Sequence, residues 1–168
     1  AAAGAENHVH LAVHQAGVIL KNALFRLPDR ADSLAVPRVT FGEPELAQVG
    51  LTEAQARARG HAVEILRAPF FENERAQCER ETDGHIKAVL SPRGRVLGAG
   101  IVGARAGDLI LPWTMAVRGR RKVDELAQAV APYPTFSEAS RKAAGGHLLP
   151  RLLSERTKRL VRLLSRFG

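Results

Sequence analysis

The sequence predicts an α+β fold, with helices packed on an antiparallel sheet, and three observations support this prediction. Short runs that alternate apolar and polar residues are concentrated between residues 38 and 102, whereas helical patterns dominate after residue 107. The tight turn Ser91-Pro92-Arg93-Gly94 joins two of these runs and therefore predicts that they pair antiparallel. The 168 residues are 45% hydrophobic and 25% charged, a composition typical of a globular domain with a buried core.

The first predicted element is a helix over residues 9–26, where apolar residues recur at helical spacing. Pro28 ends this helix, and the polar residues that follow form a connector. The pattern changes to short strands after Pro37, so we place a domain boundary near residue 34.

The middle of the chain predicts strands with one short helix between them. Thr52 is a capping residue with Gln55 at the matching position of a capping box, and Gly60 ends the helix, which therefore covers residues 53–59. The strands are expected at residues 38–41, 47–51, 63–67, 84–91 and 95–102.

Helices make up the last third of the chain. One is expected from beyond Gly107 to about residue 118, with Pro112 in its first turn, and a second over residues 123–130. A third begins at residue 137 and is broken by Gly145-Gly146, and the last and longest covers residues 148–167. The predicted domains are residues 1–34, 35–147 and 148–168.

The formal net charge of +8 is concentrated at the C-terminal end. Residues 151–168 contain six Arg or Lys and one Glu, which contribute +5 and leave +3 for residues 1–150. Aromatic residues make up 5% of the chain and are not interleaved with basic residues, so we expect no nucleic-acid binding. An apolar stripe lies opposite the basic residues of the last helix and comprises Leu149, Leu152, Leu153, Leu160, Leu163, Leu164 and Phe167.

Two interpretations of this stripe are open. A basic amphipathic helix over residues 149–167 can make a peripheral contact with an anionic membrane. The same stripe can instead pack on its own domain or on a second copy, with the basic side in solvent.

The run Gly98-Ala99-Gly100-Ile101-Val102-Gly103 matches the pattern of a dinucleotide-binding turn and raises the alternative of a small Rossmann-type enzyme. These glycines lie inside an alternating strand, however, and the next helix begins only near Gly107. We therefore interpret them as glycines that let the strand bulge and pack closely against a helix.

The histidines and the cysteine predict no metal site. His10 and His14 share a helix face near His8, but Glu6 is the one further ligand candidate nearby. The remaining histidines, His61, His85 and His147, are isolated in sequence and are expected at the surface. Cys78 is the single cysteine, which excludes an intrachain disulfide within these residues and predicts an inert thiol in a reducing compartment, the cytoplasm.

The segment at residues 133–138, YPTFSE, is the best candidate for a catalytic site. Prolines on both sides of Tyr133 stiffen the backbone from which its hydroxyl projects, and Glu138 follows at the start of the next helix. A hydroxyl and a carboxylate so placed suit a proton donor or a hydrogen-bonding group that orients a substrate. The alternative is a loop with a packed tyrosine.

Several motifs together resemble the C-terminal interface domain of the flavin-dependent pyridine nucleotide-disulfide oxidoreductases, the family of dihydrolipoamide dehydrogenase, glutathione reductase and mercuric reductase. The resemblance covers about residues 9–147. In chain order the motifs are VPRVTF (36–41), EPE (43–45), VGLTE (49–53), LGAGIVG (97–103), AGDLI (106–110) and PTFSE (134–138).

This resemblance implies a role within a longer enzyme. In the family, NAD(P)H reduces FAD, FAD reduces a disulfide, and the dinucleotide fingerprints and redox-active cysteine pair lie in N-terminal domains. Residues 10–16 resemble the helix that closes the FAD domain, which implies that His10 and Gln15 lie beside the flavin. The interface domain completes the active site of the partner in a homodimer, so the isolated chain is expected to be inactive and to hold no cofactor tightly.

Two departures from the family pattern limit which branch of the family and which substrate we expect. Disulfide reductases have a histidine before Pro-Thr, whereas this chain has Tyr133, which resembles the mercuric-reductase-like branch. The cysteine pair near the C-terminus of mercuric reductases is absent from residues 164–168, LSRFG. We therefore expect a mercuric-reductase-like oxidoreductase whose substrate the sequence does not identify. The alternative is a stand-alone binding module that uses the last helix for membrane or nucleic-acid contact.

Overall fold

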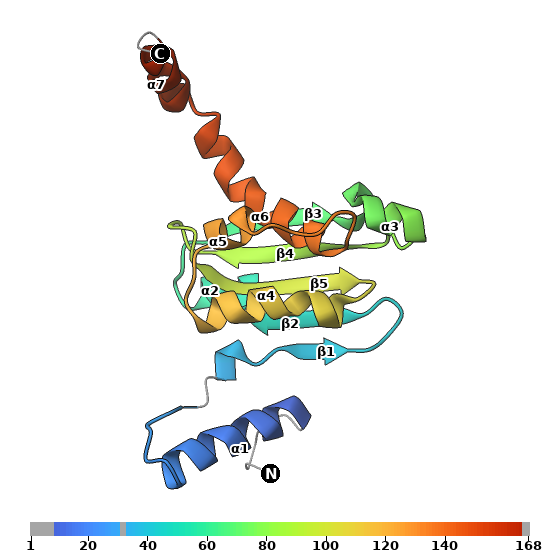
Figure 1. Cartoon of the computed structure of the whole chain (residues 1–168), viewed down its shortest axis with the longest axis vertical. Helices are drawn as coiled ribbons and strands as arrows, with labels where there is room; N and C mark the ends of the chain where they lie inside the picture. Colours follow the sequence, from blue (N-terminus) through green and yellow to red (C-terminus); the bar gives the residue numbers. More distant parts are fainter. Residues whose placement is uncertain (1–8, 31–32, 166–168) are drawn as a thin grey trace.

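The computed structural model describes residues 9–30 and 33–165 and contains a five-stranded sheet. Every neighbouring pair of strands is antiparallel, and the β4–β5 pair confirms the predicted hairpin. Figure 1 shows the sheet at the centre of the molecule. In spatial order the strands are β1 (Arg38–Thr40), β2 (Leu46–Gly50), β5 (Val96–Gly103), β4 (Gly84–Leu90) and β3 (Glu64–Pro69).

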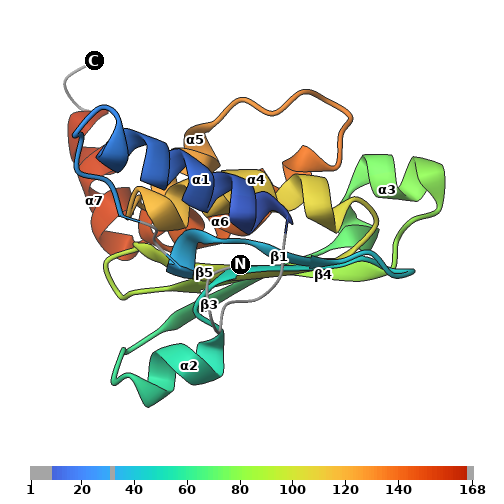
Figure 2. The ribbon, with the colours of Figure 1, turned by 90° about the horizontal axis from the view of Figure 1, so that it is seen from below.

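Helices cover both faces of the sheet unequally. Figure 2 shows α4 (Ala106–Arg118), α5 (Val123–Gln128) and α6 (Ser137–Leu152) above one face and α2 (Glu53–Ala58) below the other. The short helix α3 (Glu74–Glu79), which follows the 3-10 turn η2 (Phe70–Glu72), lies at one end of the sheet and was not predicted. The expected α+β class, an antiparallel sheet with packed helices, is confirmed.

The main core lies between the sheet and α4–α6. Because side chains alternate along a strand, Ile86 and Leu90 of β4 enter this core, whereas Val89 joins a smaller cluster beside α2. Trp113 of α4 and Phe70 are the largest fully buried side chains of the core.

The glycine-rich run lies in β5, so the strand interpretation is confirmed. A Cβ at Gly98 would lie 2.2 Å from the Leu51 carbonyl oxygen, and one at Gly103 would lie 2.6 Å from the Phe70 ring. Gly103 also has a φ of +135°, which favours glycine. The glycines were expected to allow close packing against a helix. Their close neighbours are instead the backbone after β2 and the Phe70 ring.

The predicted break at Gly145-Gly146 is wrong, because α6 continues through both glycines to Leu152. Ala143, Ala144 and His147 are buried on this helix, and their packing outweighs a cost of about 1 kcal/mol per glycine. The chain breaks instead before Ser154, whose hydroxyl caps α7 (Glu155–Leu164) by accepting a bond from the Thr157 amide at 3.3 Å.

Other helix boundaries also differ from the prediction. Helix α4 begins at Ala106, so Pro112 lies in its second turn rather than its first, where its missing N–H removes one backbone hydrogen bond of the helix. Helix α1 (Val9–Ala23) ends three residues before the predicted end and lies beyond the β1 edge of the sheet (Figure 1). None of the helices formed by the described residues is both long and apolar enough to span a bilayer.

Candidate functional site

Residues 133–138 form the end of the loop between α5 and α6 and the start of α6. Phe136 is 3% exposed and meets Phe70 edge to face, with ring centroids 5.9 Å apart. The Arg105 guanidinium lies 4.8 Å from the centre of the Phe136 ring on another side. Tyr133, three positions earlier, is 72% exposed. The segment is therefore anchored in the core at Phe136 and presents Tyr133 outward.

Asn73 holds the backbone of the same segment. Its side chain is almost completely buried and donates a hydrogen bond from Nδ2 to the Thr135 carbonyl at 3.0 Å. Its Oδ1 accepts a bond from the Ala76 amide at 2.9 Å and so caps α3. Asn73 was not predicted as a functional residue, although an Asn before the acidic Glu74 is typical of a helix start.

Glu138 has an unsatisfied carboxylate. Its side chain is 14% exposed, and Oε1 lies 3.7 Å from Nη2 of Arg141. Its Oε2 is buried and has no hydrogen-bond partner. A buried acceptor without a donor costs about 1–3 kcal/mol. Within the described residues no hydrogen bond joins Glu138 to Tyr133.

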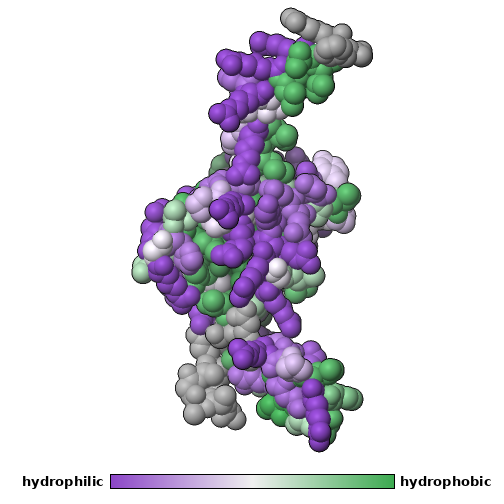
Figure 3. Space-filling model, turned by 90° about the vertical axis from the view of Figure 1, so that its left-hand side faces the viewer, coloured by the Kyte–Doolittle hydropathy of each residue, from purple (hydrophilic) through white to green (hydrophobic). Residues whose placement is uncertain are grey.

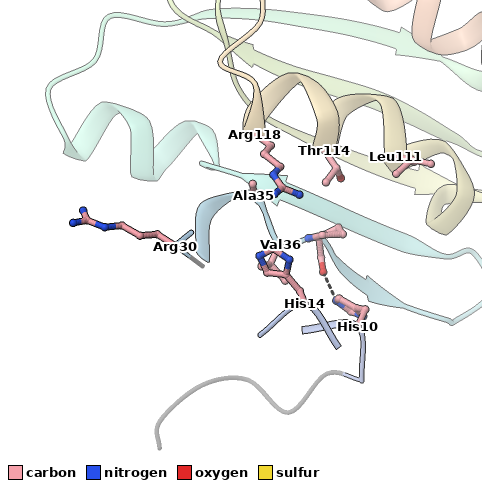
Figure 4. Close-up of a pocket in the computed structure, with 9 residues that line it drawn as sticks. His10, His14, Arg30, Ala35, Val36, Leu111, Thr114 and Arg118 are labelled. Carbon is pink, nitrogen blue, oxygen red and sulfur yellow. Dashed lines mark hydrogen bonds between the residues drawn. The ribbon is translucent and has the colours of Figure 1, made fainter. Parts of the chain in front are cut away.

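The predicted flavin contacts lie on α1, where a pocket opens toward α4. Its lining includes His10, His14, Leu111 and Arg118 (Figure 4). Nε2 of His10 is 2.8 Å from the Pro37 carbonyl oxygen. Gln15 is half-buried but does not line this pocket, because five positions along a helix turn it about 140° from His10. The structure thus brings His10 and His14 together and leaves Gln15 on another side, and flavin binding stays a prediction.

The expectation that His147 lies at the surface is wrong. It is 2% exposed, with Nδ1 2.9 Å from Oε2 of Glu64 and Nε2 4.0 Å from Oδ1 of Asp124. Gly94 makes the space, because a Cβ there would lie 2.6 Å from Nε2. His147 therefore ties α6 to β3, whereas its buried Nε2 and the nearby Oδ1 of Asp124 on α5 have no hydrogen-bond partner among the described residues. The sequence neighbours of His147 do not indicate this long-range contact.

The histidines, cysteine and acids form no metal centre in the part of the chain that the structure describes, since no group of three or more of them is close enough. His8 and Glu6, which belong to the histidine cluster considered from the sequence, lie outside the described residues. Cys78 is exposed on α3.

Comparison with known proteins agrees with this geometry. Residues 36–144 match the family model described as the dimerisation domain of pyridine nucleotide-disulphide oxidoreductases. Dihydrolipoyl dehydrogenase of Bacillus subtilis is 39% identical over 129 residues, which are 76% of this chain and 27% of that enzyme. Mercuric reductase of Lysinibacillus sphaericus is 39% identical over 137 residues, 81% of this chain and 25% of that enzyme.

Solved structures show the same domain. LpdA from Mycobacterium tuberculosis has a TM-score of 0.80 and 30% identity, over 90% of this chain and 32% of that one. The flavoprotein disulfide reductase RclA from Escherichia coli, in its Cu(II) complex, has a TM-score of 0.77 over 84% of this chain and 33% of that one. Its identity of 23% supports the fold alone. The chain spans about a quarter to a third of the length of these relatives.

The fold and the matched family model define a dimerisation domain of the oxidoreductase class. The chain belongs to the pyridine nucleotide-disulphide oxidoreductase family, in which residues 36–144 form this domain. The resemblance inferred from the sequence is confirmed. The antiparallel sheet excludes a Rossmann fold for these residues, and the comparisons give a stand-alone membrane or nucleic-acid module no support.

Proposed function

We propose that this chain is part of a longer FAD-dependent oxidoreductase that uses NAD(P)H, and that two copies form a homodimer in which each dimerisation domain completes its partner's active site. The observation that carries the proposal is the outward position of Tyr133 on a segment fixed from behind by Phe136 and Asn73. A side chain on a rigid support that faces away from its own domain is suited to a site built with another chain.

Tyr133 and Glu138 have different roles in this proposal. The Tyr133 hydroxyl donates a hydrogen bond or a proton to a group bound in the partner's site. The Glu138 carboxylate accepts a bond from a donor that the assembled dimer or its substrate supplies, which satisfies the buried Oε2. Because a neutral phenol does not accept a proton as an imidazole does, we assign Tyr133 an orienting role rather than that of a base.

Helix α1 supports the presence of a neighbouring FAD domain in the longer enzyme. Among its residues only Val18 is buried, whereas Val13, Ile19 and Leu20 are at least half exposed. An apolar surface of this kind fits a helix that packs against the remainder of its domain. His10 and Gln15, on different sides of α1, would then contact different parts of the cofactor.

Bound FAD would accept a hydride from NAD(P)H and pass the electrons to the substrate. We assign the tight binding of both cofactors to the upstream domains, with α1 beside the FAD. A cytoplasmic location stays a prediction from the sequence.

The test is the kinetics of Tyr133→Phe and Glu138→Gln in the full-length enzyme. Each should lower turnover about tenfold or more, because a positioned donor or acceptor is lost, while flavin absorbance and the mass of the dimer are unchanged. Glu125→Gln is the matched control, since Glu125 is an exposed acid paired with Arg121 at 3.5 Å, and it should leave turnover unchanged. Wild-type kinetics for Tyr133→Phe with every acceptor tried would contradict the assigned role.

A further inference from the structure

Helix α7 is the one helix of ten or more residues in the described chain that buries no side chain. It extends from the end of α6 away from the sheet (Figure 1). Its apolar side chains are about half exposed: Leu160 54%, Val161 58%, Leu163 51% and Leu164 59%. The apolar stripe of α7 therefore does not pack on its own domain, which was one of the two interpretations of the sequence.

Three leucines and two of the four basic side chains lie on opposite sides of α7, whereas Arg156, four residues before Leu160, lies on the side of the leucines. With about 100° between successive residues, Leu160, Leu163 and Leu164 fall on one side. Lys158 and Arg162 fall on the other side. Figure 3 shows hydrophobic and hydrophilic residues on separate sides of this part of the molecule. The helix carries four basic residues against one acid, Glu155, whose carboxylate pairs with Lys158 at 2.8 Å.

We propose that α7 is a peripheral membrane-binding helix that lies in the interface of an anionic lipid bilayer. The leucines enter the boundary of the acyl chains, and the Arg and Lys side chains reach the phosphate groups. We choose an anionic membrane as the partner because of charge complementarity: the negative potential of an anionic lipid surface attracts a basic helix. Since α7 is too short to cross the bilayer, the contact is superficial.

The same features argue against other occupants. Four half-exposed aliphatic side chains offer on the order of 300 Å², whereas a stable protein interface buries about 800 Å² per partner. Nucleic acid would use the basic residues but not the leucines, and the described part of the helix has no aromatic residue on which a base could stack.

Vesicle flotation of the 168-residue chain tests the proposal. The chain should float with vesicles that contain phosphatidylglycerol and remain behind with pure phosphatidylcholine. Leu160→Ser with Leu164→Ser should abolish flotation, and Arg159→Gln with Arg162→Gln should weaken binding at least about tenfold. The matched control, Arg67→Gln with Arg93→Gln, removes the same charge from exposed positions of the domain and should bind like the wild type.

Several results would overturn the proposal. One is that the wild-type chain does not float with the vesicles. Another is that the two double arginine variants weaken vesicle binding equally, which would indicate attraction by net charge alone. A smaller mass in light scattering for the leucine variant, without vesicle binding by the wild type, would identify a second copy as the occupant. Salt-sensitive DNA binding that survives the leucine substitutions, again without flotation, would identify a polyanion. None of these results bears on Tyr133 or Glu138, so the two proposals fail separately.

Discussion

Helices α4 and α7 both have an apolar side, yet the structure uses them differently. Helix α4 packs on the sheet and buries five residues. Helix α7 buries none, although its leucines recur at the same spacing. The five buried residues of α4 are Ala106, Leu109, Ile110, Trp113 and Ala116.

The difference teaches that apolar periodicity identifies a helix but not its partner. The remaining side chains are more informative. Helix α4 carries one acid and one base, Asp108 and Arg118. Helix α7 carries four bases and one acid, Glu155. Of these two helices, the one with balanced charge packs in the core, whereas the one with three more bases than acids buries no side chain.

The largest expected effect comes from removing the central side chain of α4. Trp113 is fully buried, and its Nε1 donates a bond to the Ser140 hydroxyl at 3.1 Å. Trp113→Ala should lower the free energy of unfolding by about 3–5 kcal/mol through lost burial and a cavity. Leu163→Ala in α7 should change it by less than about 0.5 kcal/mol. Urea unfolding followed by circular dichroism measures both, and equal losses would show that α7 belongs to the core.

A smaller effect is expected where α6 is held to the domain. His147→Ala removes the bond to Glu64 and leaves Asp124 beside an empty space. The free energy of unfolding should fall by about 1–3 kcal/mol, and amide hydrogen exchange should accelerate along α6. His61→Ala, at an exposed position, is the control and should have no measurable effect. If both variants behave alike, the buried cluster does not hold α6.

The smallest effect concerns an ion pair on the α2 side of the sheet. The pKa of Glu53 is lowered by a hydrogen bond from Lys87 first and from Arg57 second. A carboxylate with a lowered pKa stabilises the folded state above its ordinary pKa, and this contribution is lost as the pH falls through the lowered value. Lys87→Met should therefore lower the melting temperature slightly at neutral pH. A loss that persisted at acid pH, where Glu53 is protonated, would assign the effect to packing.

Local signals in the sequence were sufficient for much of the fold. The turn at Ser91-Pro92-Arg93-Gly94 predicted the β4–β5 pair, which the structure contains. Thr52 and Gln55 predicted a capping box, and both of its hydrogen bonds are present. These features depend on residues within a few positions of one another, so the sequence expresses them directly.

The errors arose where distant residues decide. Gly145 and Gly146 stay helical because α6 packs on the sheet, and His147 is buried because Gly94 leaves room for its ring. Asn73 acts on Thr135, 62 positions away. For the candidate site, the sequence identified Tyr133 and Glu138 but not the contacts that support them or the unsatisfied oxygen of Glu138.

A mixed dimer of the full-length enzyme tests the central claim most directly. One subunit has the redox-active cysteine pair that the family resemblance places in the upstream domains replaced by serine, and the other has Tyr133→Phe with Glu138→Gln. If each domain completes its partner's site, the mixed dimer contains one intact site and should recover about half of the wild-type activity. Activity no higher than the mean of the two parent homodimers would contradict the account, because the site would then lie within a single chain.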